Sequence, residues 1–521
     1  MTAAAAAQRL GEVRAWWHVA RPPKPLATRL EAFYVVALGV GTIGLLLYGT
    51  ASSALAAWIT PSTLAEWGPS VVLLALLVAA RWGSWQGPVV FARPDVAFLL
   101  GGPLPRAGLV TPRLRWALIR GALAGAAVGA FVLVGLSGRG RSVELGSAIG
   151  LLAGLALCGV FAIPLAWAVQ CSARVSRRLG QAAPALVLIA AGMVALARSG
   201  PTGRDVVLWS GPWGWAVQPV AGVARGRWLA GLVLLALATV AACVLALRRA
   251  AACATERHAL RADARDGASA SLRALDVRSA QLAMRGVESR PGRRRRSGVR
   301  VPQHAALAVP WRDLSATLRV PGRLAEAAVL GGAGSALALT HADHFPSAMI
   351  AALLTYLGVA RLLEPLRLEV DVPATTRTLL VRPYGRVLVA HIAVALGWVG
   401  LVTAVVAVPC ALAGSIVVRP GALVVVALAS LPTIALCAAL SARRGGRMPL
   451  EVLLFASSGP DPSGGGVVVL LWLVAWPAGA ALIAGGATHL ATTAHGVTSA
   501  VLLAVIAPFT LASVLRGSQP G

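Results

Sequence analysis

Charge is scarce in this sequence, and lysine is almost missing. Charged residues make up 13% of the 521 positions, and 57% of the positions are hydrophobic; soluble domains carry about 25% charged residues. Lys24 is the only lysine among 47 basic residues, which outnumber 19 acidic ones. A water-soluble fold cannot hide so much apolar sequence behind so few charges, so the composition excludes a row of soluble domains. It also excludes a chain that is disordered throughout.

Motifs for catalysis and for nucleotide binding are also lacking. A P-loop needs the pattern G-x-x-x-x-G-K-[ST], and Lys24 lies in a Pro-rich stretch with no glycine beside it. The six cysteines form no C-x-x-C pair. We find no Ser/His/Asp or Cys/His constellation either. We therefore expect no enzyme activity, no catalytic or metal-binding residue and no cofactor in this chain, and any ATPase would be a separate polypeptide.

Long apolar runs account for most of the sequence. A helix needs about 20 mostly apolar residues to cross the hydrocarbon of a membrane. The sequence predicts an all-α polytopic membrane protein of about twelve spans in two six-helix halves. The predicted spans are 32–49, 69–84, 116–137, 145–170, 183–198 and 228–247 in the first half, and 326–340, 347–365, 387–411, 421–441, 466–486 and 496–515 in the second.

Basic residues are distributed unevenly between the segments that connect these spans. With the N-terminus in the cytoplasm, and without the seventeen basic residues of 248–323 between the halves, the inner segments hold 23 basic residues and the outer ones hold 7. Basic residues concentrate in the cytoplasmic loops of membrane proteins. We therefore expect a multi-pass protein of the cell (inner) membrane with both termini in the cytoplasm.

An Arg-rich stretch, 248–309, interrupts the apolar pattern and contains Arg293 to Arg296 in a row. We interpret it as a solvated cytoplasmic linker, partly helical and partly disordered. The alternative is a surface that binds anionic lipid head groups. The chain then consists of a first six-helix half with an N-terminal interfacial helix (1–247), this linker, and a second six-helix half (310–521).

The two halves share a motif after their second predicted span. Asp95 precedes Arg106 by eleven positions, and Asp371 precedes Arg382 by the same distance. Each half also starts with an amphipathic, Trp-containing segment that leads into its first span, as interfacial helices do. We interpret the chain as a parallel repeat, because internal repeats are common among transporters.

The stretch from Asp95 to Arg106 has the composition of a short amphipathic helix. Asp95 can cap the N-terminus, residues 98–100 (Phe-Leu-Leu) give an apolar face, and residues 101–103 (Gly-Gly-Pro) end the helix. A helix of this kind on the inner surface can insert into a groove of a soluble partner. The alternative is an interfacial helix that lies flat on the lipid.

In these stretches the chain resembles the ABC-2 type transporter permease family. More narrowly, it resembles ABC exporter permeases of high-GC bacteria in which two such units are fused. The resemblance is carried by Asp95 to Arg106 and by Leu363 to Pro373, which reads Leu-Glu-Pro-Leu-Arg-Leu-Glu-Val-Asp-Val-Pro. It covers the whole chain in layout, but only these two stretches in motif.

The resemblance implies a function and a set of contact residues. The chain would be the permease subunit of an ABC exporter that couples ATP hydrolysis by separate cytoplasmic ABC ATPase subunits to the export of a hydrophobic or amphiphilic substrate. One permease chain per complex would suffice, with membrane lipid and no nucleic acid as further partner. The loop after each second span would be a coupling helix. The residues that would face the ATPase are Asp95, Leu99, Leu100, Pro103, Arg106, Asp371, Leu379, Leu380 and Arg382.

The second copy of the motif departs from the first, because Thr375, Thr376 and Arg377 replace the apolar residues 99–101. The two ATP sites would then be coupled unequally. Two alternatives to an exporter stay open at this point: a membrane scaffold or assembly protein that transports nothing, and a secondary transporter. The near absence of ionisable residues inside the spans argues against a proton-driven transporter.

Overall fold

The computed structural model is helical, and it holds no strand in the part of the chain that it describes. The chain divides into two compact units, unit 1 (Met1–Ser271 with Ala280–Arg290) and unit 2 (Leu272–Ser279 with Pro291–Gly521). Each unit is described by itself. The described residues are 59–137, 142–273, 307–371, 390–412, 430–444 and 474–492, with a few isolated positions besides.

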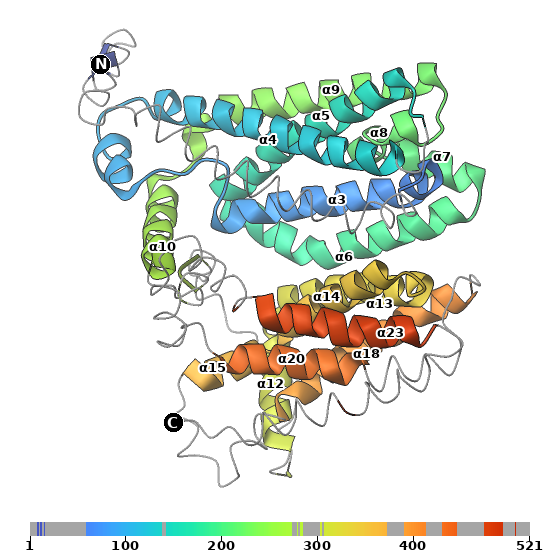
Figure 1. Ribbon diagram of the computed structural model, residues 1–521. Coiled ribbons are helices and arrows are strands. Elements are labelled where there is room, and N and C mark those ends of the chain that lie inside the picture. The colour runs from blue at the N-terminus through green and yellow to red at the C-terminus, as the bar shows by residue number, and fades with distance from the viewer. Residues whose placement is uncertain are drawn as a thin grey trace, which may run out of the picture. The chain divides into compact units, whose positions relative to one another are not determined.

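Unit 1 is a bundle of long, mostly apolar helices that lie side by side (Figure 1). Helix α5 is central, because it packs against α3, α4 and α9, while α6 packs against α3. The elements are α3 (Pro61–Trp85), η1 (Asp95–Leu100), α4 (Arg106–Ser137), α5 (Leu145–Cys171), α6 (Ala173–Arg198), α7 (Pro201–Trp209), α8 (Pro212–Trp215), η3 (Gln218–Val220), α9 (Arg225–Arg248), η4 (Ala250–Ala252) and α10 (Thr255–Arg273).

Unit 2 is built around α14, which packs against α13, α18, α20 and η7. Its core consists mainly of small and branched apolar side chains. Such side chains are typical of the contacts between helices in membrane proteins. The elements are α12 (Ala308–Leu318), α13 (Pro321–His341), α14 (Phe345–Leu362), α15 (Glu364–Asp371), α18 (Ile392–Leu412), α20 (Leu431–Arg443), η7 (Ala481–Gly485) and α23 (Gly486–Leu490).

Several of these helices are compatible with a membrane protein. Within the described residues, four are long and apolar enough to cross a membrane: Pro61–Trp85, Arg106–Ser137, Leu145–Cys171 and Gly226–Arg248. The number rises to as many as six if each of two bent pairs is one span, namely Ala173–Ala183 with Ala185–Arg198 and Ser347–Leu362 with Glu364–Val370. The predicted spans 32–49 and 496–515 lie outside the described residues. A total of twelve and the repeat of two halves stay predictions.

Close contact between α4 and α5 depends on glycines on both helices. A Cβ at Gly125 would collide with the backbone of Leu155, and a Cβ at Gly159 would collide with the backbone of Gly121. Gly121 and Gly125 are four positions apart and therefore lie on one face of α4. This small-xxx-small spacing lets two apolar helices approach backbone to backbone, so α4 and α5 move as one packed pair.

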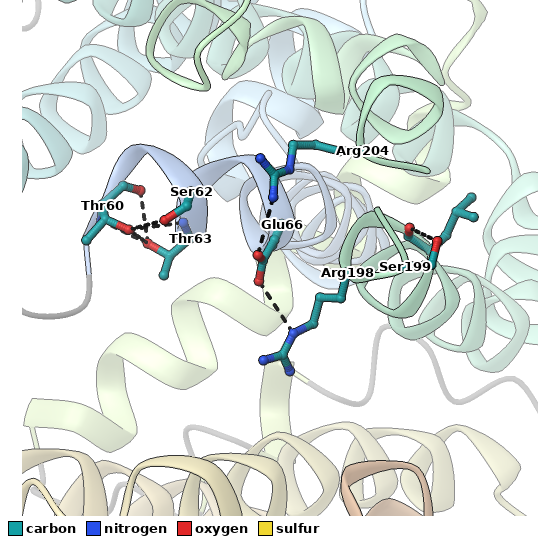
Figure 2. A network of polar contacts seen from close by, with 8 residues as sticks. Thr60, Ser62, Thr63, Glu66, Arg198, Ser199 and Arg204 are labelled. Atoms are coloured by element: carbon teal, nitrogen blue, oxygen red, sulfur yellow. Dashed lines mark hydrogen bonds and ion pairs between the residues drawn. The ribbon is translucent and has the colours of Figure 1, made fainter. Parts of the chain in front are cut away.

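A polar network holds the N-terminal end of α3 (Figure 2). The side chain of Thr60 caps α3 and accepts a hydrogen bond from the backbone N–H of Thr63, 3.1 Å away. One turn further on, Glu66 pairs with Arg198 of α6 at 3.5 Å and with Arg204 of α7 at 3.6 Å. The network therefore joins three helices at the end of α3 that lies away from Trp85.

The first part of the predicted linker belongs to the packed body of unit 1. Its helix α10 buries His258 and Arg261, whereas we expected a solvated spacer. An arginine is buried only where carbonyls or carboxylates satisfy its N–H groups. The partners of Arg261 are backbone carbonyls of unit 1, described below.

Candidate functional site

The segment after α3 forms one turn of π-helix, η1 (Asp95–Leu100), followed by a turn that leads into α4. The N–H of Gly101 donates to the carbonyl of Val96, five residues back, and this wide spacing defines a π-turn. Short π-turns occur often at functional sites, because they re-aim side chains that a regular helix would place elsewhere. The predicted short helix after the second span is therefore present, in this wider form.

Asp95 anchors η1 to α4 instead of facing outward. Its carboxylate is buried, and its Oδ2 accepts a hydrogen bond of 2.8 Å from the guanidinium of Arg113. The same guanidinium lies over the ring of Phe91, 3.9 Å from its centroid, which adds a cation–π contact. Val96 and Leu100 are buried on the same side of the turn. Charge-assisted bonds of this length are strong, so η1 is tied to α4.

The other side of η1 is exposed and apolar. Phe98 is 77% exposed, more than any other large apolar side chain of the described residues. Among the predicted contact residues, Pro103 and Arg106 are exposed and Leu99 is half-buried, whereas Asp95 and Leu100 are buried. This corrects the predicted contact set, because Asp95 and Leu100 are not available to a partner and Phe98, which that set omitted, is available.

In unit 2 the predicted contact segment begins in α15, which follows α14 after a bend of 59°. Leu366 and Glu369 of α15 are buried, whereas Leu368 is exposed. Asp371 is the last residue of α15. The predicted contact residues Leu379, Leu380 and Arg382 lie outside the described residues. The contact face predicted for this copy therefore stays a prediction.

Four ionisable side chains meet at α15 in a cluster that the sequence analysis did not foresee. Arg312 and Asp313 come from α12, Glu369 from α15, and His391 lies directly before α18. The guanidinium of Arg312 donates to Glu369 Oε2 at 2.9 Å and lies 3.7 Å from Asp313 Oδ1. The ring of His391 lies 2.6 Å from Asp313 Oδ2 through Nδ1, and 3.4 Å from the Arg312 guanidinium through Nε2. We call these residues the unit 2 cluster.

The geometry of the unit 2 cluster assigns the proton of its histidine. A guanidinium can only donate, so Nε2 of His391 accepts from Arg312, and Nδ1 carries the proton that is donated to Asp313. Asp313, Glu369 and His391 are all buried. Glu369 Oε1 has no hydrogen-bond partner among the described residues.

In the described part of the chain, no three His, Cys, Asp or Glu side chains are placed to hold a metal ion. The cluster links three helices, because one guanidinium and one imidazole join α12, α15 and the start of α18. Removing Asp313 would leave the buried ring of His391 without its carboxylate partner, and removing Glu369 would take from Arg312 its shortest bond.

A small cavity lies within unit 2, between α13, α14, α18 and α20. Its volume is about 30 Å³, which suits one or two water molecules. Side chains that contribute hydroxyl groups to its wall are Ser335, Thr355, Thr403, Ser430 and Thr488. Three of them donate to the carbonyl four residues back in their own helices. The cavity is too small for an amphiphilic molecule.

The unit 2 cluster was missed because its members are far apart in the sequence. Asp313 and His391 are separated by 78 positions, and Arg312 and Glu369 by 57. One signal was available: Asp313, Glu369 and His391 lie next to apolar runs in a chain that has only 19 acidic residues and 8 histidines. Ionisable residues in such places are costly to bury and are often paired.

Comparisons of the chain with protein-family models, with curated proteins and with solved structures found no match.

Proposed function

We propose that the chain is the transmembrane subunit of an ATP-driven exporter, and that separate ATPase subunits bind to it from the cytoplasm. The observation that carries the proposal is the construction of η1, which exposes Phe98 while Asp95 holds the turn to α4. In this proposal the Trp85 end of α3 and η1 lie on the cytoplasmic side, and the Glu66 network lies on the outer side.

The contacts of η1 supply a route for mechanical coupling. A partner that binds Phe98 and changes its own position would displace η1. The opposite face of η1 is bonded to α4 through Asp95 and Arg113. Helix α4 is packed on α5 through glycines, so the two helices follow together. Packed helices have discrete arrangements, and a displacement at the surface is therefore passed on as a rigid-body movement. ATP binding and hydrolysis in the partner would drive this movement.

In this proposal unit 2 binds the ATPase in a different way from unit 1. Helix α15 is held by α12 and by the residue before α18, through the unit 2 cluster. Its exposed apolar side chain, Leu368, offers less surface than Phe98 does. We expect the ATPase to depend more on unit 1 than on unit 2 for its attachment. A hydrophobic or amphiphilic substrate remains the favoured class, since the candidate spans carry so few ionisable groups.

Co-purification tests the proposal. The chain is expressed together with a P-loop ATPase encoded beside it, solubilised in mild detergent and captured through an affinity tag on the chain. We expect the ATPase in stoichiometric amount with the wild type, and at least a tenfold weaker complex with Phe98→Glu, because a buried carboxylate at a contact is costly. Leu260→Glu is the matched control, since Leu260 is exposed on α10 of the same unit.

Two results would contradict the proposal. One is a chain that binds no P-loop ATPase under conditions in which it stays folded. The other is a complex that Phe98→Glu and Leu260→Glu weaken to the same extent, because the segment η1 would then have no special part in the contact.

A second candidate, a proton-coupled secondary transporter, is favoured by the unit 2 cluster. Three buried ionisable groups are joined to an arginine there, and such groups mark proton pathways in membrane proteins. Transport by the reconstituted chain separates the candidates. If a proton gradient alone drives transport, Glu369→Gln abolishes it, and no ATPase binds, this second function is the better one.

A further inference from the structure

The end of α5 is surrounded by basic residues of α10. The guanidinium of Arg261 donates to the carbonyls of Gly83 and Gln170, both at 3.2 Å, and to that of Ser84 at 3.3 Å. These carbonyl groups lie in the last turns of α3 and α5. The carbonyl groups of a last helical turn have no hydrogen-bond partner within their own helix. Arg257 donates to the same carbonyl of Gln170 at 3.2 Å. Two guanidinium groups therefore converge on the residue that precedes Cys171.

Two thiols lie within this basic surrounding. Cys171 is the last residue of α5, and Cys253 directly follows η4. The two side chains form a hydrogen bond with each other, and both residues pack in the same apolar cluster. Sγ of Cys253 also lies 3.9 Å from the carbonyl of Gln170. Cys253 is buried, whereas Cys171 is half-buried and gives a small oxidant access to the pair.

His258 completes the surrounding of Cys253. It is buried, its ring meets Phe91 edge to face with centroids 5.0 Å apart, and it forms a hydrogen bond with Cys253. The hydrogen bond from Cys171 lowers the pKa of Cys253 to about 5, against the effect of burial, and His258 and Arg261 act in the same direction. A cysteine with such a pKa is a thiolate at neutral pH, and the thiolate is the form that reacts with oxidants.

We propose that Cys171 and Cys253 are a redox-active pair that forms a reversible disulfide in the presence of a hydroperoxide, fastening α10 to the end of α5. The proposal concerns unit 1 alone and does not depend on the ATPase partner. Neither residue is in a disulfide in the structure. A disulfide is about 2.05 Å long, so the two sulfurs must approach each other for it to form.

The oxidation proceeds in two balanced steps. The Cys253 thiolate attacks the terminal oxygen of the hydroperoxide, the O–O bond breaks, and the leaving alkoxide or hydroxide takes a proton from solvent. Cys253 is then a sulfenic acid. The sulfur of Cys171 attacks the sulfur of Cys253, the S–O bond breaks, and the hydroxide leaves as water with the proton of Cys171. The two sulfurs together lose two electrons, which reduce the peroxide. A dithiol reductant reverses the reaction.

The disulfide would restrict the movement of α10 relative to the rest of unit 1. Helix α10 is now held by the buried Arg261, the bond from Arg257 and the exposed ion pair between Arg93 and Asp263. These contacts can be exchanged with water, whereas a disulfide cannot. Oxidation would therefore fix the start of the segment between the units on unit 1, beside the α3 carbonyls that lead into η1.

Peptide mapping of the full-length chain tests the proposal. The chain is purified in detergent with dithiothreitol, desalted, treated with hydrogen peroxide at a tenfold molar excess, blocked with N-ethylmaleimide and digested with trypsin. Cleavage after Arg141, Arg174, Arg249 and Arg257 places Cys171 on peptide 142–174 and Cys253 on peptide 250–257. We expect more than half of peptide 250–257 to be linked to peptide 142–174, and dithiothreitol to release it.

Matched variants make the result specific. Cys158 lies on the same peptide as Cys171 and is buried apart from Cys253, so Cys158→Ala should leave the linked product unchanged. Cys171→Ser should abolish it, and Cys253 should then accumulate as a sulfenic acid that dimedone labels. Cys171→Ala should also slow alkylation of Cys253 by iodoacetamide at pH 7 several-fold, because less of it is thiolate. The proposal is overturned if Cys253 stays a thiol, or if it oxidises in the wild type without joining Cys171.

Discussion

Unit 1 and unit 2 anchor the segment after their candidate second span in different ways. In unit 1 one ion pair, Asp95 with Arg113, does so, and the guanidinium side chain is 35% exposed. In unit 2 the segment α15 is held by Arg312, Asp313, Glu369 and His391, and three of these four residues are buried.

The difference indicates which segment is built to move. The arginine of the unit 1 pair is 35% exposed and the arginine of the unit 2 cluster is 43% exposed, so the two anchors differ in how many groups they join and not in the hydration of the arginine. The unit 2 cluster loses more when one member leaves, because Asp313, Glu369 and His391 are all buried and depend on one another. We therefore interpret η1 as the movable contact and α15 as the fixed one.

The largest expected effect is on the unit 2 cluster. Asp313→Ala should lower the free energy of unfolding by about 3–5 kcal/mol, since it leaves the buried ring of His391 without its carboxylate partner and Arg312 with one carboxylate instead of two. Thermal unfolding in detergent measures the loss. The control is Asp343→Ala, whose carboxylate side chain is 45% exposed beside His344 and should change stability by less than about 0.5 kcal/mol. Equal losses would contradict the role given to the cluster.

The ion pair of unit 1 should matter less. We expect Asp95→Ala to cost about 1–3 kcal/mol, because Arg113 can turn partly toward solvent once its partner is gone. A double-mutant cycle with Arg113→Ala measures the coupling between the two side chains. A loss as large as that of Asp313→Ala would show that the two anchors are alike and would remove the basis of the comparison.

Replacing each anchoring arginine by lysine sharpens the contrast. Arg312 uses its fork to reach Glu369, His391 and Asp313, which one ammonium group cannot do, so Arg312→Lys should cost about 1.5 kcal/mol. Arg113→Lys can keep its pair with Asp95 and should lose only the contact over Phe91, about 0.5–1 kcal/mol. The same unfolding measurement on both variants decides; a reversed order would count against the account.

The smallest effect on stability is expected at Phe98. Phe98→Ser removes an apolar side chain that is mostly exposed and makes few contacts within the chain. The free energy of unfolding should therefore change by less than about 0.5 kcal/mol. Circular dichroism during heating measures this. A large loss would mean that Phe98 is a structural residue, and the contact proposed for it would need another explanation.

The sequence predicts the apolar helices better than their ends. The predicted run 69–84 lies within Pro61–Trp85, and the run 116–137 lies within Arg106–Ser137. Both helices start earlier than their apolar stretch, because polar residues such as Thr60 and Glu66 cap or extend them at the end of the span. Hydropathy locates residues that lipid or a core can accept, and it does not report where hydrogen bonding stops.

The sites depend on pairings that one sequence does not contain. The amphipathic pattern of residues 95–100 predicts a short helix, but only the position of Arg113 decides that Asp95 faces inward and Phe98 outward. The same holds for Cys171 and Cys253, which lie 82 positions apart and meet because α10 folds back on α5. Such contacts follow from the packing of helices, which the spacing of residue types does not define.

Site-specific photo-cross-linking tests the central claim most directly. A photoreactive amino acid replaces Phe98 in one variant and Leu260 in another, both in the full chain in cells, and the cross-linked proteins are identified by mass spectrometry. The account predicts a P-loop ATPase cross-linked at position 98 and none at position 260. Cross-links at position 98 to lipid alone, or equal ATPase capture at both positions, would contradict it.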